Sequence, residues 1–410
     1  MKFKNYIMEI LILSGVILLL FYSSDPILYP DSPRYINGSL LDPPLYSTLI
    51  KVMLLIIGTL NSVVVLQVLC IGLSVIYFTK TIAIHFNLNT ITKIVISLFL
   101  FIPSLQFYNV MLTEPFSYAF SLFFVSLVLK LIFNFNIQNL IWCSVFVTLL
   151  LLTRSQFIFL YPLILLLFLG ILSLFKSKKT LVWLSVSFLS IFLIHNSLIF
   201  FNKYIKQNSV SIDSISHDSL GPFFYTYIDA IYISSAKDVK LFEDQNSQKV
   251  LIKIFEEMEN QKALMKYYNG RGHFGLSLGH IKNYSKSFLK DLAYQKNTDV
   301  ISIKKNISFK LIKANFKKYV KHIFKKFYDS SWLFIFVPFS MLLAGLISFL
   351  KYKSQFSLLV LFISSFSLTN HSVVYLFGRV QPRYFIYTDF ILLIFIFLFL
   401  NILLQKKVKI

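Results

Sequence analysis

Two acidic residues stand out because they occur in short polar segments between long apolar runs. Asp31 lies in Tyr29-Pro-Asp-Ser-Pro-Arg-Tyr35, and Glu114 lies in Leu112-Thr-Glu-Pro115. A carboxylate at such a position can act as a general base on a hydroxyl group or can hold a divalent metal ion. The residues therefore predict acid–base or metal chemistry, and both alternatives stay open at this point.

Arginines and tyrosines occur in comparable segments. Arg154 stands between two apolar runs in Thr153-Arg-Ser-Gln156, and Arg379 and Arg383 lie in Gly378-Arg-Val-Gln-Pro-Arg-Tyr384. Arginine makes permanently charged, bidentate contacts with phosphate groups. Because a charge at membrane depth is costly, such residues are candidates for function. Together with the two acids, they indicate a site for a phosphate-bearing substrate.

Each of these residues also has a purely structural interpretation. Asp31 can start a turn or cap a helix, and Glu114 before a proline suits the first turn of a helix. Arg379 and Arg383 can anchor the chain at lipid headgroups. Arg154 can be the structural partner of a buried carboxylate. Residue type alone does not separate the two interpretations.

The composition indicates a membrane protein. Of the 410 residues, 56% are hydrophobic and 14% are charged, and the mean hydropathy is +0.70. Soluble domains have a charged share of about a quarter. The formal charge of +22 would be compatible with nucleic-acid binding, but the basic residues gather at the ends of apolar runs. We therefore expect an all-α polytopic membrane protein with no nucleic-acid partner.

About ten apolar segments predict membrane-spanning helices. They are about 6–22, 62–79, 91–109, 115–133, 139–153, 157–175, 180–201, 331–350, 355–375 and 384–404. The segment 45–60 is ambiguous, since its length covers roughly 24 Å of a core about 30 Å thick. Lys51 at its centre also costs about 2.5–3.5 kcal/mol to insert. We expect 45–60 to form juxtamembrane helices in the first outer loop.

The basic residues decide the sidedness. If 45–60 does not cross and the N-terminus is inside, the inner loops carry most of the lysines that flank the spans, as the positive-inside rule requires. Those lysines are Lys2, Lys4, Lys80, Lys93, Lys176, Lys178, Lys179, Lys351, Lys353, Lys406, Lys407 and Lys409. Both termini are then cytoplasmic, and Asp31, Glu114 and the arginines of the short loops share the outer face.

This arrangement divides the chain into three parts. Residues 1–201 form an N-terminal transmembrane module, whose first outer loop, 23–61, carries the candidate site. Residues 202–330 predict a mostly helical extracytoplasmic insert, and residues 331–410 form the C-terminal transmembrane helices.

The insert has amphipathic patterns at about 247–268 and 303–327. Its histidines and nearby aspartates lack a recognised ligand spacing, so we expect no metal site built on them. Those residues are Asp213, His217, Asp218, His273 and His280.

Five short motifs occur in order along the chain: Asp31-Ser32 with Tyr35, Pro43-Pro-Leu-Tyr46, Thr113-Glu-Pro115, Arg154 and Arg383-Tyr384. In this order and on one face, they resemble motifs of the GT-C superfamily of membrane glycosyltransferases. The resemblance is to bacterial relatives of protein O-mannosyltransferases and lipid A aminoarabinose transferases. One family feature is absent, because Asn315 is followed by Phe316 where the family usually has Asn-Pro.

The resemblance implies inverting glycosyl transfer from a polyprenyl-phosphate sugar to an acceptor hydroxyl at the outer face of a bacterial cytoplasmic membrane. Asp31 is then the candidate general base, and Glu114 assists it or shares a divalent cation with it. The implied substrate-binding residues are Tyr35, Arg154, Arg379, Arg383 and Tyr384. The acceptor is left open between a glycan, a lipid and a protein.

Three other functions agree less well with the sequence than a glycosyltransferase does. A polysaccharide polymerase or ligase of the O-antigen type depends on arginines in large outer loops, but 202–330 contains only Arg271. A flippase or transporter for a lipid-linked sugar predicts internal repeats and charges along the bundle centre, and neither is evident. A purely structural scaffold would leave the clustered outer charges unexplained.

Overall fold

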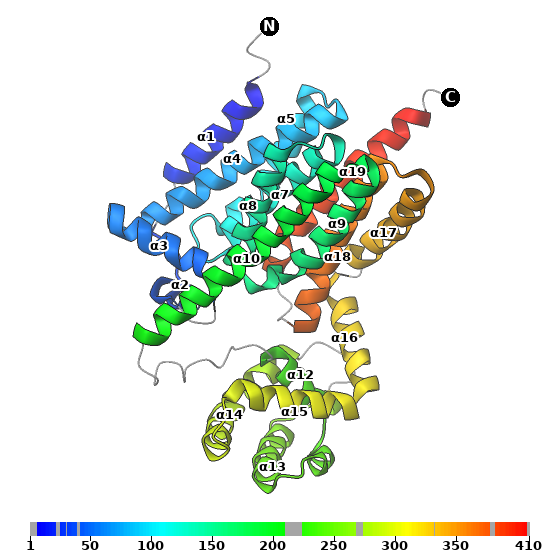
Figure 1. Ribbon diagram of the computed structural model, residues 1–410. Coiled ribbons are helices and arrows are strands. Elements are labelled where there is room, and N and C mark those ends of the chain that lie inside the picture. The colour runs from blue at the N-terminus through cyan, green and yellow to red at the C-terminus, as the bar shows by residue number, and fades with distance from the viewer. Residues whose placement is uncertain are drawn as a thin grey trace. The chain divides into compact units, whose positions relative to one another are not determined.

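The structure is a computed structural model that describes residues 6–21, 25–29, 31–38, 42–209, 224–267, 274–331, 333–377 and 382–407. These residues are almost entirely helical, and the only β-pairing among them is one isolated bridge between Ile27 and Val110. The all-α class is therefore confirmed. The chain divides into two compact units (Figure 1), namely Met1–Ser209 with Phe336–His371 and Gln381–Ile410, and Val210–Ile335 with Ser372–Val380.

Seven helical segments, among the residues that the structure describes, are long and apolar enough to cross a membrane. They are α4 (Asn61–Phe86), α5 (Thr90–Phe101) with α6 (Ser104–Phe107), α7 (Glu114–Phe133), η2 (Ser155–Phe159) with α9 (Leu160–Phe175), α10 (Lys178–Ser209), α17 (Leu333–Tyr352) and α18 (Gln355–Phe377). The other three predicted spans fall on α1 (Ile7–Phe21), α8 (Ile137–Thr153) and α19 (Ile386–Lys407). The apolar stretches found in these helices, Ile7–Phe21, Ile137–Thr153 and Ile386–Leu400, are shorter than those of the seven segments. The total of ten spans stays a prediction, as does the three-part division of the chain.

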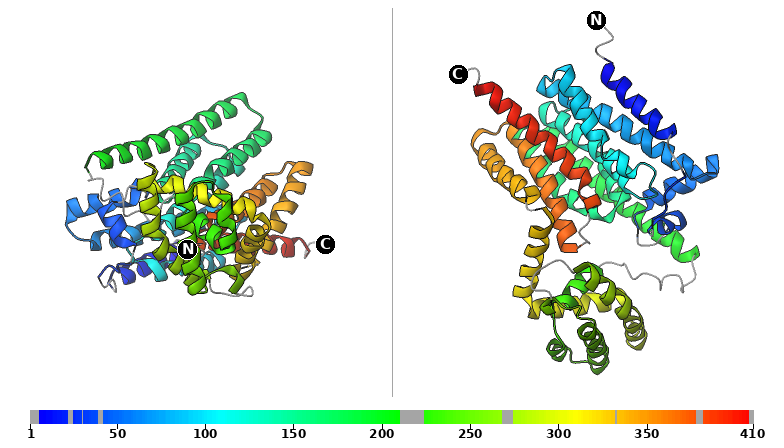
Figure 2. Two further views of the ribbon diagram at one scale, coloured as in Figure 1. Left: turned by 90° about the horizontal axis from the view of Figure 1, so that it is seen from below. Right: turned by 180° about the vertical axis from the view of Figure 1, so that it is seen from behind.

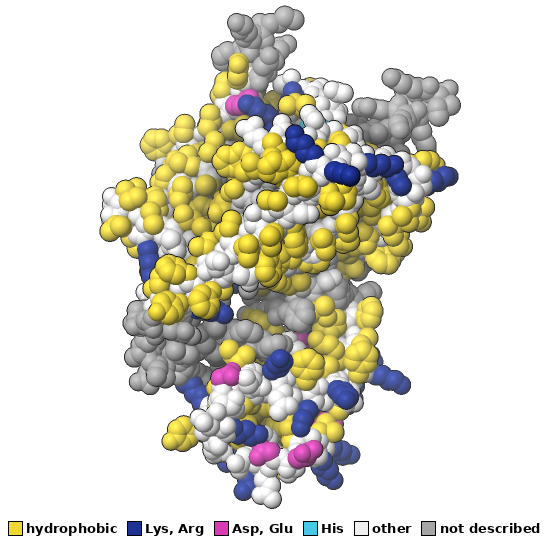
Figure 3. Space-filling model, in the orientation of Figure 1, with side chains coloured by type: hydrophobic (Ala, Val, Ile, Leu, Met, Phe, Trp, Pro, Cys, Tyr) yellow, Lys and Arg dark blue, Asp and Glu magenta, His cyan; other side chains and the backbone are white. Residues whose placement is uncertain are grey.

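Helix α7 lies at the centre of the first unit and packs against α4, α8 and α19. Almost every α7 side chain is buried, including Phe116, Phe124 and the small residues Ser117 and Ser121. Small residues let neighbouring backbones approach closely in an apolar bundle. In contrast, α10 and α17 expose most of their apolar side chains, and Figure 3 shows a broad apolar surface over the first unit. Such a surface is what lipid would cover.

Two glycines mark close helix–helix contacts in this unit. A Cβ atom at Gly72 of α4 would lie 2.5 Å from Val16 Cγ2 of α1, and one at Gly170 of α9 would collide with Leu358 of α18. The absence of a side chain at these positions therefore sets how closely α1 approaches α4 and α9 approaches α18.

The start of α1 and the end of α19 lie at the same end of the bundle (Figures 1 and 2). At that end, Lys80 of α4 pairs with Glu9 of α1 at 2.8 Å. The candidate site is at the opposite end, where α1 ends and α7 begins. Which end faces the cytoplasm stays a prediction.

The second unit is a small helical domain with its own apolar core. It contains α12 (Phe224–Ile233), η3 (Ala236–Leu241), α13 (Gln245–Asn260), η4 (Met265–Tyr267), α14 (Phe274–Gln295), α15 (Val300–Ala314) and α16 (Phe316–Ser331). Asp244 and Asp299 cap α13 and α15 by accepting hydrogen bonds from the backbone N–H groups of Ser247 and Ser302. The two amphipathic patterns fall on α13 and on α15–α16, and their apolar faces form much of the core.

Candidate active site

The segment after α1 is fixed against the segment that leads into α7. The Ile27 N–H donates to the Asn109 carbonyl at 2.9 Å, and the Met111 N–H donates to the Ile27 carbonyl at 3.0 Å. The buried Ser32 hydroxyl donates to the Met111 carbonyl and accepts from the Tyr29 N–H, both at 2.9 Å. These bonds satisfy backbone groups that would otherwise be orphaned, and they bring the Asp31 loop beside Glu114.

Asp31 directly precedes α2 (Ser32–Asn37), which is the position of a helix cap, but its side chain makes no capping hydrogen bond. Its Oδ2 atom lies instead 3.4 Å from Arg383 Nη2, and 37% of the side chain is exposed. The structural interpretation of Asp31 as a helix cap is therefore wrong for its side chain. The carboxylate is available to a ligand while being paired with a cation.

Glu114 is the first residue of α7, and Pro115 follows it where a missing N–H costs no helical hydrogen bond. The Glu114 side chain is only 5% exposed, and its Oε1 atom lies 3.0 Å from Arg154 Nη1 and 3.4 Å from Arg383 Nε. Arg154, which ends α8 in an extended conformation, is also nearly buried. The alternative interpretation of Arg154, as partner of a buried carboxylate, describes this geometry.

Asp31, Glu114, Arg154 and Arg383 thus form a guanidinium–carboxylate cluster, contributed by a loop, the start of α7, the end of α8 and the start of the last helical segment. Two carboxylates and two guanidiniums balance formally. That balance matters because an unpaired buried charge is strongly unfavourable. The cluster is layered, with Glu114 and Arg154 buried and Asp31 and Arg383 partly exposed.

The Tyr384 ring contacts both guanidiniums of the cluster. Arg154 Cζ lies 4.7 Å and Arg383 Cζ lies 5.2 Å from the ring centroid, and Arg383 Nη2 donates to the Tyr384 hydroxyl at 3.3 Å. A cation over an aromatic face is attracted by the quadrupole of the ring. Tyr384 therefore orients the two arginines relative to each other.

Tyr35, on α2, is buried. Its hydroxyl accepts a hydrogen bond from Arg34 Nη2 at 3.3 Å, and its ring meets that of Tyr46 edge-on at 5.4 Å. Burial raises the pKa of Tyr35 above its ordinary value, so the phenol is neutral at physiological pH. Arg34 in turn pairs with Asp42 at 2.7 Å, which ties α2 to the segment that follows it.

Sequence reasoning missed the residues that hold Tyr384. Asn370 of α18, fully buried, donates to the Tyr384 carbonyl at 3.1 Å and to Thr388 Oγ1 at 3.0 Å. Gln156 donates to Asn370 Oδ1 at 2.5 Å and to the same Tyr384 carbonyl at 3.3 Å. The signal that could have found them is the presence of amides next to or within apolar runs, where an unsatisfied polar group is costly.

A second pair of ionisable residues lies next to this network. His371 Nε2 lies 3.4 Å from Asp389 Oδ1, and the imidazole stacks on the Phe385 ring with centroids 4.3 Å apart. His371 is fully buried. It thus packs the start of α19 against α18 behind Tyr384.

Several predicted residues cannot be placed. Arg379 lies outside the residues that the structure describes, and so do Asp213, His217, Asp218, Arg271 and His273.

The arrangement does not fit a divalent cation shared by Asp31 and Glu114. Arg383 contacts both carboxylates, and Arg154 contacts the same Glu114 oxygen, so a metal there would lie beside two fixed positive charges. Elsewhere in the described part of the chain, no group of three or more His, Cys, Asp or Glu side chains could hold a metal. Asp31 and Glu114 are thus each paired with a guanidinium, an arrangement that suits acid–base and anion-binding chemistry.

Comparison of the chain with protein-family models, with curated proteins and with solved structures finds no match. The chemistry of the guanidinium–carboxylate cluster itself therefore indicates what the site can do. Chemically, its exposed layer offers one carboxylate that can accept a proton and one guanidinium that can bind an anion. Its buried layer holds that guanidinium in place.

Proposed function

We propose that this chain is a membrane glycosyltransferase that moves a sugar from a polyprenyl-phosphate donor to an acceptor hydroxyl. The observation that carries the proposal is the 3.4 Å contact between the partly exposed Arg383 guanidinium and the partly exposed Asp31 carboxylate. An anion-binding group and a proton acceptor lie together at one end of an apolar bundle. A lipid-linked phosphate can approach this place along the lipid, and a polar acceptor can approach it from water.

Arg383 is the proposed binding group for the donor phosphate. A guanidinium recognises phosphate through paired N–H donors, and Arg383 Nη2 already faces one anionic oxygen of Asp31. A donor phosphate would compete with Asp31 for Arg383. Its binding would therefore release the Asp31 carboxylate toward the acceptor.

Asp31 is the proposed general base. The acceptor oxygen attacks the anomeric carbon of the sugar, and its proton passes to the Asp31 carboxylate. The bond between the anomeric carbon and the phosphate oxygen breaks, and its electron pair leaves with polyprenyl phosphate. Attack opposite the leaving group inverts the anomeric centre. Arg383 stabilises the charge that develops on the leaving phosphate.

Glu114, Arg154 and Tyr384 are proposed as positioning residues. The two contacts of Glu114 Oε1 tie Arg383 to Arg154, which is buried at the end of α8. Tyr384 contacts both guanidiniums. Together they would hold Arg383 in one orientation before the donor arrives, which reduces reorganisation during the reaction. Glu114 is not assigned a proton-transfer or metal-binding role.

The proposal includes about ten membrane spans, with the site at the outer face of a bacterial cytoplasmic membrane and a role in cell-envelope glycan synthesis. One observation favours the alternative of a flippase for a lipid-linked sugar. The His371–Asp389 pair lies between α18 and α19, and ionisable pairs within a bundle are found along transport pathways. The two functions differ in chemistry, because a flippase leaves the sugar–phosphate bond intact.

The test uses the full chain, purified into lipid nanodiscs. The donors are synthetic short-chain polyprenyl-phosphate hexoses and pentoses, and the acceptor is an envelope extract of the source cells. Mass spectrometry measures free polyprenyl phosphate and glycosylated product. We expect Asp31→Asn to lower the rate by about 10²–10⁴-fold, the usual contribution of a general base.

Asp25→Asn is the matched control, since Asp25 is an exposed acid in the same loop, and it should retain the wild-type rate. If the wild-type protein releases polyprenyl phosphate from none of the donors, the glycosyltransferase proposal is wrong. If Asp31→Asn reacts at the wild-type rate, Asp31 is not the base.

A further inference from the structure

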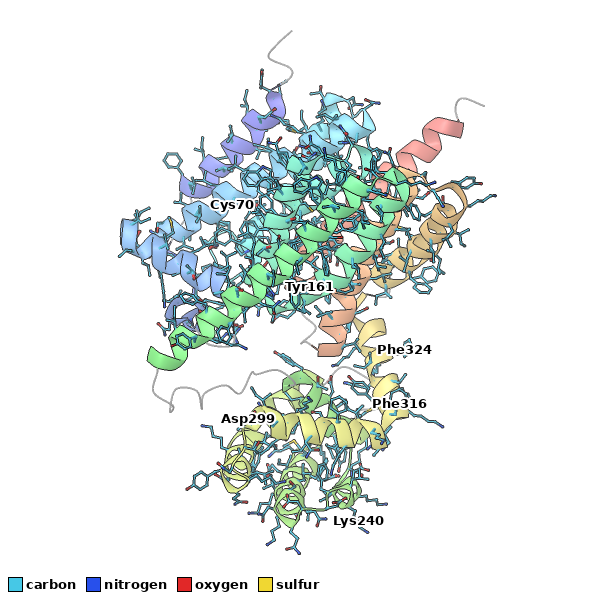
Figure 4. All side chains as sticks on the ribbon, in the orientation of Figure 1. Cys70, Tyr161, Lys240, Asp299, Phe316 and Phe324 are labelled. Atoms are coloured by element: carbon cyan, nitrogen blue, oxygen red, sulfur yellow. The ribbon has the colours of Figure 1, made fainter. Side chains whose placement is uncertain are left out.

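Helix α16 has an apolar strip that the second unit leaves uncovered. One side of α16 faces the core of this unit, where Tyr319 packs and where His322 and Ile323 are buried. Residues 316, 320 and 324 recur every fourth position and so share another side of the helix. Of these, Phe316 is 62% and Phe324 is 70% exposed (Figure 4). Phe316, Val320 and Phe324 are here called the α16 strip.

Lysines lie along one edge of the α16 strip. Lys317 and Lys321 directly follow Phe316 and Val320 and are exposed, and the chain has no acidic residue from Phe316 to Lys326. An amphipathic helix with aromatic residues on one side and lysines beside them is typical of helices that lie in the membrane interface. The charge pattern therefore fits an anionic surface with an apolar interior.

The rotation of α16 about its axis is fixed by a buried ionic contact within the second unit. Lys326 Nζ lies 2.7 Å from both carboxylate oxygens of Asp229 on α12, and His322 Nε2 lies 3.0 Å from Oδ1. Asp229 is fully buried. Turning α16 to cover Phe316 and Phe324 would break these contacts and strand a buried carboxylate. The strip therefore stays on the outside of this unit.

The chain itself keeps α16 close to the membrane. α16 ends at Ser331, and α17, which is long and apolar enough to span a membrane, begins at Leu333. A helix joined to a span by one residue has its C-terminal end at the membrane surface. Lipid is therefore always present at high concentration beside this end of α16. Among the partners that could cover an apolar and basic strip, it is the one that the connection to α17 favours.

We propose that α16 binds the bilayer surface, with Phe316, Val320 and Phe324 between the lipid headgroups and with Lys317 and Lys321 on anionic lipid phosphates. This site is separate from the guanidinium–carboxylate cluster and does not rest on the proposed enzymatic activity. It would tether the second unit to the membrane through lipid.

The test places an environment-sensitive fluorophore on a single cysteine in the full chain, after Cys70 and Cys143 are replaced by alanine. The label is placed at position 324, at position 320, or at position 252 as a control. Ile252 is an exposed apolar residue of α13 in the same unit. The protein is embedded, one copy per nanodisc, in phosphatidylcholine alone or with added phosphatidylglycerol. Quenching is measured with nitroxide-labelled lipid and with aqueous iodide.

We expect lipid nitroxide to quench labels at 320 and 324 about threefold or more above the label at 252, as for a helix buried in the headgroup region. Iodide should quench them less. Replacing Lys317 and Lys321 by glutamine should reduce the lipid quenching in discs with anionic lipid. Equal lipid quenching at 252, 320 and 324 would overturn the proposal. Protection from iodide without lipid quenching would also overturn it, because a protein would then cover the strip.

Discussion

Glu114 Oε1 lies 3.0 Å from Arg154 Nη1 at the junction of α7 and α8, and neither side chain is more than 13% exposed. Removing one partner of such a pair leaves the other charge in a poor solvent, which is the costly part of breaking a buried salt bridge. The pair is therefore a structural requirement of the site whatever reaction the site performs.

Glu114→Gln should destabilise the protein more than Arg154→Met does. The first change removes a carboxylate from both Arg154 and Arg383, whereas the second leaves Glu114 in contact with Arg383. We expect Glu114→Gln to cost about 3–5 kcal/mol, as for other broken buried pairs. The midpoint of thermal unfolding in nanodiscs measures the difference. Equal midpoints for wild type and Glu114→Gln would contradict a structural role for the pair.

Asn370→Ala should loosen the segment that carries Tyr384 and Arg383. The change removes two donated hydrogen bonds and leaves the Tyr384 carbonyl with Gln156 alone of these two amide donors. An unsatisfied buried group costs about 1–3 kcal/mol, and the thermal midpoint should fall accordingly. Asn196→Ala is the control, since Asn196 is exposed on α10 and its hydrogen bonds, to the Phe192 carbonyl and with the Tyr161 side chain, do not involve Tyr384. Equal losses in the two variants would mean that the α18 network does not hold Tyr384.

Gly72→Val should separate α1 from α4. A side chain at this position would press on Val16 Cγ2, and overpacking of this kind costs about 1–3 kcal/mol. Leu73→Val serves as the control, because Leu73 is exposed on the next position of the same helix. Fluorescence-detected size exclusion after heating would measure both variants. Similar heat resistance in both would show that α1 moves away from α4 without cost.

The second unit should lose stability as pH falls below about 6.5, the ordinary pKa of histidine. Burial lowers the pKa of His322, so the folded unit keeps a neutral imidazole that the unfolded chain protonates first. Between the pKa of His322 in the folded unit and about 6.5, the unfolded state binds more protons than the folded state. The free energy of unfolding therefore decreases as the pH is lowered through this range. The rate of amide hydrogen exchange in α12 and α16, corrected for intrinsic rates, should increase as the pH is lowered from 7.5 to 5.5.

His322→Gln should flatten that pH dependence, because glutamine keeps a polar group at this position but does not titrate. If the variant and the wild type show the same pH dependence, another group is responsible.

The sequence predicted the helices well because long apolar runs can only be stable as helices in lipid. Every predicted span falls on a helix, and the α7 start at Glu114 follows from the Glu-Pro pair. The sequence could not show which apolar runs cross a membrane. The helices α1, α8 and α3 (Pro44–Ile57), the last of which covers the ambiguous segment, are all short and apolar, so neither length nor composition distinguishes them.

The candidate site was predicted as a set of residues, not as a set of contacts. Charge and sidedness indicated that Asp31, Glu114, Arg154 and Arg383 share one face, and the structure brings these four together. Their pairing could not be predicted, because it depends on the packing of helices that are distant in sequence. The Ile27–Val110 bridge and the Asn370 network carry no local pattern.

The order of the cluster along the chain has a consequence for biosynthesis. Asp31, Glu114 and Arg154 leave the ribosome early, whereas Arg383 follows more than two hundred residues after Arg154. Until the last helix enters the bundle, the cluster in the nascent protein has two carboxylates and one guanidinium, and so an excess of one negative charge. When α19 inserts, Arg383, just before it, neutralises this excess charge, and the contacts of Arg383 with Asp31 and Glu114 stabilise the inserted helix.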